Sequence, residues 1–211
     1  MPFSYAALKL CLCLVGFIAA RLFILLRGRL LMISFKTQLL DEKAVMRALR
    51  RVSHEIIERN RGISDIVIVG IKRRGEQIAS LIHDNIEMIE NASVPCASLD
   101  ITFYRDDLSL EYESPVIKKS ELPFSVTGKK VILVDDVIYT GRTVRAAIDA
   151  LFTIGRPSCI QLAVLVDRGH RELPFRPDFV GLNVPTAGSE MVSVCVEEID
   201  GEYSVKLYDI K

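Results

Sequence analysis

Two adjacent carboxylates, Asp135 and Asp136, follow an apolar run and precede a short segment of hydroxyl groups and glycine. The apolar run Val131–Val134 has no polar alternation, which is typical of a strand buried on both faces of a parallel sheet. Thr140–Thr143 then opens a helix that is predicted to run to about Leu151. Free N–H groups and the positive dipole end make a helix N-terminus an anion site. The pattern therefore predicts a phosphate cradle beside two acids that face a diol or a magnesium-bound diol.

The string VILVDDVIYTGRTV resembles the phosphoribosyl pyrophosphate (PRPP) motif of type I phosphoribosyltransferases, in which hydrophobic residues precede an acidic pair and a T-G-x-T loop. The resemblance implies that the loop binds the 5-phosphate and that the acids face the ribose hydroxyls. The alternative is a helix capped by Asp and Thr without a ligand, since both are ordinary capping residues. No Walker A sequence occurs in the chain.

A second phosphate-binding segment follows the apolar strand predicted at Ile66–Ile71. The turn Lys72–Gly75 carries three cations and precedes a helix predicted at Glu76–Ile89. Such a turn suits a pyrophosphate, and the family resemblance implies that it binds the leaving group and often contains a cis peptide. The alternative is a basic surface turn.

A predicted strand at Ala97–Phe103 leads into a polar stretch from Tyr104 to Thr127 that is long for a structureless loop. We expect this stretch to be a mobile lid, because an oxocarbenium-like ribosyl centre must be kept from water. Arg105 is placed to neutralise pyrophosphate as charge builds on it. The alternative is a solvated acidic loop.

A third segment, LVDRGHRELP, leaves the strand predicted at Cys159–Val166. Together with H-E-x-I-E-R-N, V-G-I-K-x-R-G, D-I-T-x-Y-R-D-D-L and the PRPP motif, it resembles the PyrR-type bifunctional regulators of pyrimidine genes, which are also uracil phosphoribosyltransferases. The resemblance covers about residues 38–210. It implies that backbone groups around Val166–Arg168 read the base and that His170 is either a structural hydrogen bonder or a direct participant.

The resemblance implies roles for the following residues. Catalysis is assigned to Asp135, Asp136 and Arg105. PRPP and phosphate binding is assigned to Lys72, Arg73, Arg74, Val137, Ile138, Tyr139, Thr140, Gly141, Arg142 and Thr143. Uracil or nucleotide binding is assigned to Val166, Asp167, Arg168 and Val192. RNA binding is assigned to Arg47, Arg50, Arg51, His54, Arg59 and Arg176, with Arg171 as a further candidate.

The implied reaction converts uracil and PRPP to UMP and pyrophosphate. Magnesium is expected to bind mainly through the substrate, with Asp135 and Asp136 as the candidate protein ligands and no dedicated metal site. The implied second activity is binding of pyrimidine-operon leader RNA in response to UMP or UTP. The alternative is a salvage enzyme without an RNA role, because Leu182 and Gly188 stand where lysines are expected. The basic face of the helix predicted at Asp41–Arg61 is then an ordinary solvated surface.

Strands that alternate with helices predict an α/β fold of the type I phosphoribosyltransferase kind, with a parallel-cored twisted sheet flanked by helices and a small hood segment. The chain closes with hairpin-like segments at Met191–Glu198 and Glu202–Tyr208. At 211 residues it has room for one well-packed domain. A homodimer or homotetramer is expected.

Lys+Arg and Asp+Glu both total 27, so net charge favours no class of partner. The five cysteines show no metal-ligand spacing, which favours a reduced cytoplasmic compartment. The segment Ala6–Leu26 is apolar and, at 21 residues, long enough to span a bilayer, although Lys9 and Arg21 interrupt it. It is either a membrane anchor or translated upstream sequence, with Met32 as the working start; a signal peptide fits less well. We predict an extension over 1–31 and a phosphoribosyltransferase domain over 32–211.

Overall fold

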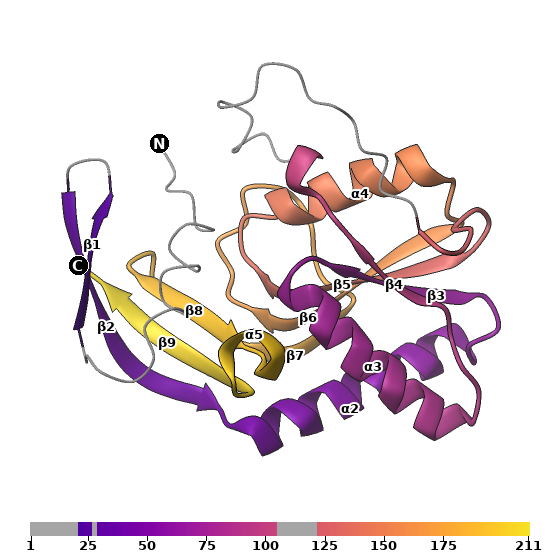
Figure 1. The fold of residues 1–211 in the computed structure, drawn as a ribbon, viewed down its shortest axis with the longest axis horizontal. Coiled ribbons are helices and arrows are strands. Elements are labelled where there is room, and N and C mark those ends of the chain that lie inside the picture. The colour runs from indigo at the N-terminus through magenta and orange to yellow at the C-terminus, as the bar shows by residue number, and fades with distance from the viewer. Residues whose placement is uncertain (1–20, 27–28, 105–121) are drawn as a thin grey trace. The chain divides into compact units, whose positions relative to one another are not determined.

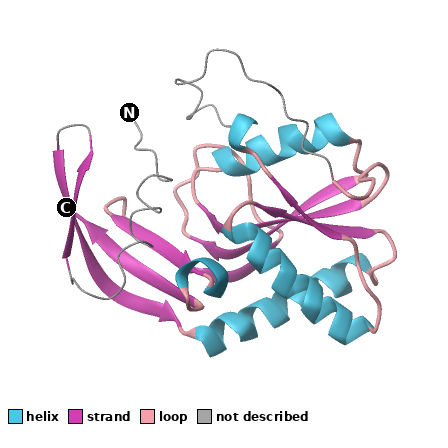
Figure 2. Ribbon diagram, viewed as in Figure 1, coloured by secondary structure: helices cyan, strands magenta, loops and turns pink. Residues whose placement is uncertain are grey.

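The computed structural model describes residues 21–26, 29–104 and 122–211 (Figure 1). The chain divides into two compact units. One comprises Met1–Val45 with Pro185–Lys211, and the other comprises Met46–Val184. In the second unit strands and helices alternate along the chain, as Figure 2 shows.

The second unit is built on a five-stranded parallel sheet with the order β4-β3-β5-β6-β7. Its strands are β3 (Ile66–Ile71), β4 (Cys96–Leu99), β5 (Lys130–Ile138), β6 (Cys159–Asp167) and β7 (Phe179–Asn183). The central strands β3 and β5 are continuously apolar up to the acid pair and are buried on both faces. Such continuous burial is what a parallel sheet covered on both sides requires. The predicted α/β class and parallel core are therefore confirmed.

Helices cover both faces of this sheet (Figure 1). On one face lies α4 (Arg142–Ile154), and on the other lie α2 (Glu42–Asn60) and α3 (Arg74–Glu90). Under α4, side chains of β3 and β5 form a buried apolar core with Val144, Ala147 and Leu151. Because β-strand side chains alternate between faces, the intervening residues of the same strands face α3.

The helix α2 follows the apolar periodicity predicted for it. Asp41 caps its N-terminus, since its Oδ1 accepts the Ala44 N–H at 2.8 Å. Its apolar stripe is fully buried at Leu49, Val52 and Ile56. The predicted helix Asp41–Arg61 is therefore confirmed to within one residue at each end.

The first unit contains a four-stranded antiparallel sheet with the order β1-β2-β9-β8. Its elements are β1 (Arg21–Leu26), β2 (Arg29–Leu40), β8 (Glu190–Cys195), the short helix α5 (Glu197–Asp200) and β9 (Ser204–Ile210). β8 and β9 pair with Met191 opposite Tyr208, so the hairpin predicted at the end of the chain is confirmed.

Only the end of the apolar segment Ala6–Leu26 belongs to the described residues. There, Arg21–Leu26 forms a strand that pairs with β2, and not the end of a helix. Across the described ranges, no helix is both long and apolar enough to cross a membrane. The predicted boundary at residue 32 stays a prediction.

Three elements differ from the sequence-based prediction. The strand expected at Ala97–Phe103 ends at Leu99, and the 3-10 turn η1 (Thr102–Tyr104) follows it. The helix expected from Glu76 begins at Arg74. The strand β7 lies in a segment rich in Arg, Pro and Gly where no strand was predicted. It forms because β6 offers it an unpaired edge, which local composition does not reveal.

Gly70 and Gly75 allow β3 and the start of α3 to pack at very short range. A Cβ on Gly70 would lie 2.7 Å from the Glu76 Cα and from the Gly75 carbonyl oxygen, and 2.8 Å from the Ala79 Cβ. These are mostly backbone atoms, so they cannot swing aside as a flexible side chain could. The strand–helix contact therefore requires glycine at position 70.

We predict that Gly70→Ala lowers the free energy of unfolding by about 1–3 kcal/mol, because the added methyl group forces β3 and α3 apart. Urea unfolding followed by circular dichroism measures this change. Gly188→Ala is the matched control, because a Cβ at that position meets nothing within 4 Å. The control should change stability by no more than about 0.5 kcal/mol. Equal stabilities for the two variants would contradict the packing argument.

Candidate active site

The carboxyl ends of β3 and β5 form the point at which the sheet's connections diverge. The loop after β3 enters α3 on one face, and the loop after β5 enters α4 on the other. In open α/β sheets this switch point leaves a crevice in which ligands bind. The two loops that leave it are the predicted pyrophosphate turn and the predicted phosphate cradle.

The pyrophosphate turn contains a cis peptide bond between Lys72 and Arg73. The Lys72 N–H donates to the Leu99 carbonyl oxygen at 3.0 Å, which ties the turn to the end of β4. Arg74 begins α3, so the turn passes directly into a helix N-terminus. Lys72 and Arg73 are exposed and Arg74 is half-buried. Three cations therefore lie at the carboxyl edge of the sheet, as predicted.

Gly75 brings this turn against the acid pair. A Cβ on Gly75 would lie 2.6 Å from the Val134 carbonyl oxygen, 3.1 Å from the Asp135 Cα and 3.4 Å from the Asp135 Oδ1. Two segments that are 60 residues apart in sequence therefore meet at backbone contact distance. The structure brings together the basic turn and the acidic pair that the sequence placed in one site.

Asp135 and Asp136 lie within β5 and not after it, which corrects the predicted end of the strand at Val134. The ladder with β6 continues past them to the pair Ile138–Asp167, so the strand is longer than its apolar run. Both residues are only 6% exposed. The Asp136 N–H donates to the Asp135 Oδ1, and the Val137 N–H donates to the Asp136 Oδ1, each at 2.9 Å.

The phosphate cradle begins at Gly141, whose φ of 93° is in the left-handed region that favours glycine. It is the N-cap of α4, so the helix starts at Arg142, two residues later than predicted. The Arg142 N–H donates to the Thr140 Oγ1 at 3.4 Å. Hydroxyl and backbone groups therefore converge on a helix N-terminus, which is the arrangement expected for an anion site.

The loop after β6 lies against this cradle. The N–H groups of Glu172 and Leu173 both donate to the Thr140 carbonyl oxygen, at 3.0 and 2.9 Å. A Cβ on Gly141 would meet Leu173 Cβ at 3.3 Å and Phe175 Cδ2 at 3.1 Å. The predicted nucleobase loop and the predicted phosphate cradle are thus neighbours.

Arg168 has the most unusual environment among the predicted base-binding residues. Its side chain is 1% exposed, and its guanidinium carbon lies 4.2 Å from the centre of the Tyr139 ring. A cation held over an aromatic face in this way is attracted by the ring's electron density. His170, at a φ of 57°, packs its ring edge-on to the same Tyr139 ring at 6.1 Å. Only the backbone of Arg168 was predicted to act, and its stacking side chain was missed.

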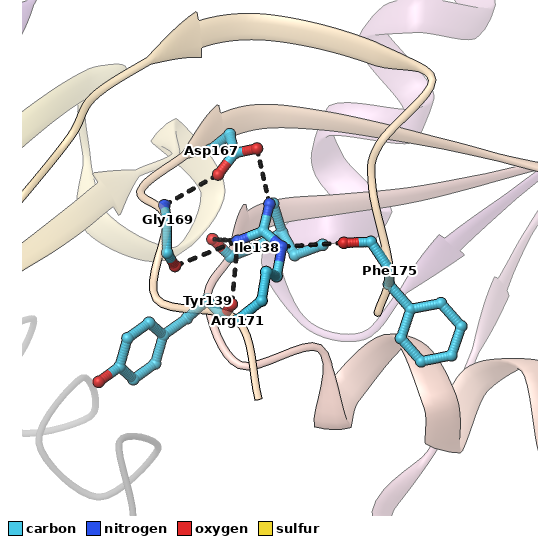
Figure 3. Close-up of polar contacts among 6 residues, drawn as sticks. All are labelled: Ile138, Tyr139, Asp167, Gly169, Arg171 and Phe175. Carbon is cyan, nitrogen blue, oxygen red and sulfur yellow. Dashed lines mark hydrogen bonds and ion pairs between the residues drawn. The ribbon is translucent and has the colours of Figure 1, made fainter. Parts of the chain in front are cut away.

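Arg171 was considered as an extension of an RNA-binding surface, and this interpretation is wrong for its guanidinium. The group points into the protein, where its Nη2 pairs with the Asp167 Oδ2 at 2.6 Å (Figure 3). The other Asp167 oxygen accepts the Gly169 N–H at 2.9 Å. Four backbone carbonyl oxygens complete its environment at 2.9–3.3 Å, those of Ile138, Tyr139, Gly169 and Phe175.

Arg105 lies outside the described residues, so its predicted catalytic contact stays a prediction. The segment just before it is anchored, because the Tyr104 hydroxyl is 3.0 Å from the Thr153 Oγ1 on α4. The Asp100 Oδ1 accepts the Thr102 N–H at 3.0 Å and the Thr102 hydroxyl at 2.7 Å. These hydrogen bonds lower the pKa of Asp100, and the nearby cations Lys72 and Arg73 lower it further.

The basic face of α2 divides into two kinds of residue. Arg51 donates to the carbonyl oxygens of Val180 and Gly181 on β7, at 2.9 and 2.6 Å. Arg59 pairs with Asp178 at 2.8 Å and lies over the Phe179 ring. The predicted RNA-binding residues that are exposed are Arg47, Arg50, Arg51, His54, Arg59 and Arg176.

Val192 is a fully buried residue of β8 in the other unit, and its predicted contact with the base stays a prediction. Cys96, Cys159 and Cys195 are free thiols. Burial raises the pKa of the Cys96 thiol to about 11.

A basic turn and an acid pair at the switch point of a parallel sheet define a type I phosphoribosyltransferase. A family model described as "Phosphoribosyl transferase domain" matches residues 36–198. The hypoxanthine phosphoribosyltransferase of Trypanosoma cruzi has the same fold, with a TM-score of 0.63 at 18% identity over 84% of this chain and 98% of that one. A hypoxanthine-guanine phosphoribosyltransferase from Bacillus anthracis gives 0.60 at 19% identity, over 82% and 98% of the two chains.

Sequence relatives are much closer. The "Bifunctional protein PyrR" of Brevibacillus brevis is 62% identical over 165 residues, which cover 78% of this chain and 92% of that protein. The protein of the same name from Clostridioides difficile is 59% identical over 172 residues, covering 82% and 97%. The chain belongs to the PyrR family. The family predicted from the sequence motifs is therefore confirmed.

We predict that Asp100→Asn lowers the free energy of unfolding at pH 7 by about 1 kcal/mol, because it removes charge-assisted hydrogen bonds from Thr102. The pKa of Asp100 is lowered on folding from its ordinary 3.8, so the ionised group stabilises the fold above pH 3.8. That contribution disappears as the pH falls through the lower folded pKa.

The stability difference between wild type and Asp100→Asn should therefore shrink below pH 3.8. Urea titrations at pH 7 and at lower pH values measure it. Asp65→Asn is the control, because its pair with Lys129 is exposed and contributes little. A difference that is independent of pH would contradict the assignment.

Proposed function

We propose that the chain transfers the phosphoribosyl group of PRPP to uracil and releases pyrophosphate. The bond from the anomeric carbon to a pyrophosphate oxygen breaks, a bond to uracil N1 forms, and the N1 proton is released. The observation that supports this most is the contact of Gly75 with the end of β5, because it joins a basic turn to a buried acid pair. PyrR relatives at 55–62% identity support the same reaction.

In this proposal each loop acts on one part of PRPP. Backbone and hydroxyl groups of Thr140–Thr143 hold the 5-phosphate at the N-terminus of α4. Asp135 and Asp136 orient the ribose hydroxyls and favour positive charge at the anomeric carbon. The cations at Lys72–Arg74, together with Arg105, bind the departing pyrophosphate. Catalysis then rests on positioning and electrostatics, and no side-chain nucleophile is needed.

The acid pair also suits a magnesium ion. Two buried carboxylates beside a phosphate cradle supply the hard oxygen donors that Mg²⁺ prefers, and Mg²⁺ commonly keeps water and phosphate ligands besides one or two carboxylates. Asp135 and Asp136 would hold it, with the rest of the coordination from the substrate. The ion would neutralise charge on the pyrophosphate.

The base is bound beside the loop after β6. The backbone around Val166–Arg168 offers donors and acceptors suited to the polar edge of a pyrimidine, and the stacked pair Arg168–Tyr139 fixes that backbone. Val192 is proposed as a further contact. His170 packs against Tyr139 and is assigned a structural role.

We predict that Asp135→Asn combined with Asp136→Asn reduces uracil phosphoribosylation by about 100-fold or more, since the ribosyl cation loses both carboxylates. UMP formation from uracil and PRPP measures it, and circular dichroism checks the fold. Asp149→Asn is the control, because this carboxylate is exposed in an i,i+4 pair with Arg145. Turnover near the wild-type value in the double variant would refute the proposed site.

We also propose that the exposed basic face of α2 binds pyrimidine-operon leader RNA when UMP or UTP is present. The relatives' name, "Bifunctional protein PyrR", supports a second activity. Arg47, Arg50 and His54 lie on this face at helical spacing and are exposed. Arg51 and Arg59 contribute less in this proposal, because β7 and Asp178 already engage their guanidinium groups.

We predict that Arg47→Glu with Arg50→Glu abolishes leader-RNA binding and leaves uracil transfer within about twofold. Each lost phosphate contact should also reduce the slope of affinity against salt by about one. Filter binding over a range of salt concentrations measures both effects.

The charge-matched control is Lys129→Glu with Arg156→Glu, which reverses two cations at the amino ends of β5 and β6. It should bind RNA as the wild type does. Weak wild-type binding that does not distinguish leader RNA from unrelated RNA would leave the chain as a salvage enzyme alone. A homodimer or homotetramer and a cytoplasmic location remain part of the proposal.

A further inference from the structure

The Arg171 guanidinium joins two chain segments that the proposed reaction uses for different parts of the nucleotide. From β5 it takes the carbonyl oxygens of Ile138 and Tyr139, at 3.3 and 2.9 Å. These residues lead directly into the phosphate cradle. From the loop after β6 it takes the Gly169 carbonyl oxygen at 3.1 Å and the Asp167 carboxylate at 2.6 Å.

These contacts use the guanidinium in several directions at once. Nη1 faces Tyr139 and Gly169, Nη2 faces Asp167, and Nε donates to the Phe175 carbonyl oxygen at 3.0 Å (Figure 3). The Arg171 and Asp167 side chains are each 19% exposed, so water competes weakly for these groups. A half-buried carbonyl oxygen that loses its donor is costly, which holds both segments to the one cation.

Neighbouring contacts tie the same two segments together. The Thr140 carbonyl oxygen accepts the N–H groups of Glu172 and Leu173. The cradle therefore cannot shift relative to the loop after β6 without disturbing Arg171 or these hydrogen bonds. Movement at one segment is transmitted to the other.

We propose that Arg171 is a positioning residue that couples the two halves of the site, so that binding of the ribose 5-phosphate half strengthens binding of the uracil half. The proposal rests on the proposed function for the identity of the two ligands. Coupling of this kind is a free energy shared between two sites, and it is reciprocal. Ordering the shared node once lowers the entropy that the second ligand must lose.

Lysine should not replace arginine in this role. The guanidinium is planar and carries five N–H donors in a fixed fork, whereas the lysine ammonium is a single point charge on a flexible stem. A lysine at position 171 can keep the ion pair with Asp167, yet it cannot also span the carbonyl oxygens of Tyr139, Gly169 and Phe175. Arg171→Lys therefore separates charge from multiple hydrogen bonding.

The test uses uracil and ribose 5-phosphate, two fragments that do not react with one another. Calorimetry gives the Kd of uracil with and without saturating ribose 5-phosphate, and the ratio of the two values is the coupling factor. Arg171→Lys and Arg171→Gln are compared with Arg156→Lys and Arg156→Gln, at an exposed position beyond the amino end of β6. Circular dichroism and thermal melting check the fold of each variant.

We expect a wild-type coupling factor of about five or more, which is the low end of typical allosteric factors. In Arg171→Lys it should fall to near one while the Kd of each fragment alone stays within about threefold. The Arg156 variants should keep the wild-type factor. A merely structural role for Arg171 would lower the melting temperature or weaken both fragments alike and leave the ratio unchanged.

An unchanged coupling factor in Arg171→Lys would overturn the inference and leave the proposed function intact. The lysine variant also decides the matter if Arg171→Gln does not fold, because lysine keeps the charge that Asp167 requires. A wild-type protein that binds neither fragment would overturn the proposed function, and the inference with it.

Discussion

The parallel pairing of β3 with β5 is the constraint on which the rest of the site depends. Their register sets Ile66 opposite Lys130 and Gly70 opposite Val134, so both strands end at the same edge. The chain after each strand must then leave for a different face, because α3 and α4 cover opposite sides. Two loops with opposite charge are thereby held against one another by the backbone ladder, and their own residues need only fit the gap between them.

That gap explains why small residues and charged residues alternate at this edge. Gly70 and Gly75 remove the side chains that would keep α3 away from the strands, and Gly141 supplies the left-handed turn into α4. The charged side chains can then face the same space at short range. A preorganised field of this kind requires little reorganisation when charge develops on a ligand, which is the usual origin of large electrostatic effects in enzymes.

Much of the fold could be predicted because its signals are local. Continuous apolar runs identified β3 and β6, and the helical spacing of Leu49, Val52 and Ile56 identified α2. The acids were assigned to the correct edge but to the wrong element, because the length of β5 is set by its partner β6 and not by its own composition. β7 was missed for the same reason, since an edge strand is created by its neighbour.

The role of Arg171 was out of reach of sequence reasoning. Its partners are mostly backbone carbonyl oxygens from two separate strand ends, and no residue type records the position of a carbonyl group. The same holds for Arg168, whose ring partner Tyr139 lies on the other strand. An arginine in a polar loop is ordinarily exposed, so only the tertiary structure distinguishes these two from the solvated cations of α2.

The contact of Arg51 with β7 has a consequence for how molecules of this protein behave when crowded. β7 is an edge of the parallel sheet, and an open edge is a template on which a strand of another molecule can add. The Arg51 guanidinium lies on the Val180 and Gly181 carbonyl oxygens and places a positive charge beside that edge. A basic residue that the sequence suggested for nucleic acid thus also protects the sheet from intermolecular extension and aggregation.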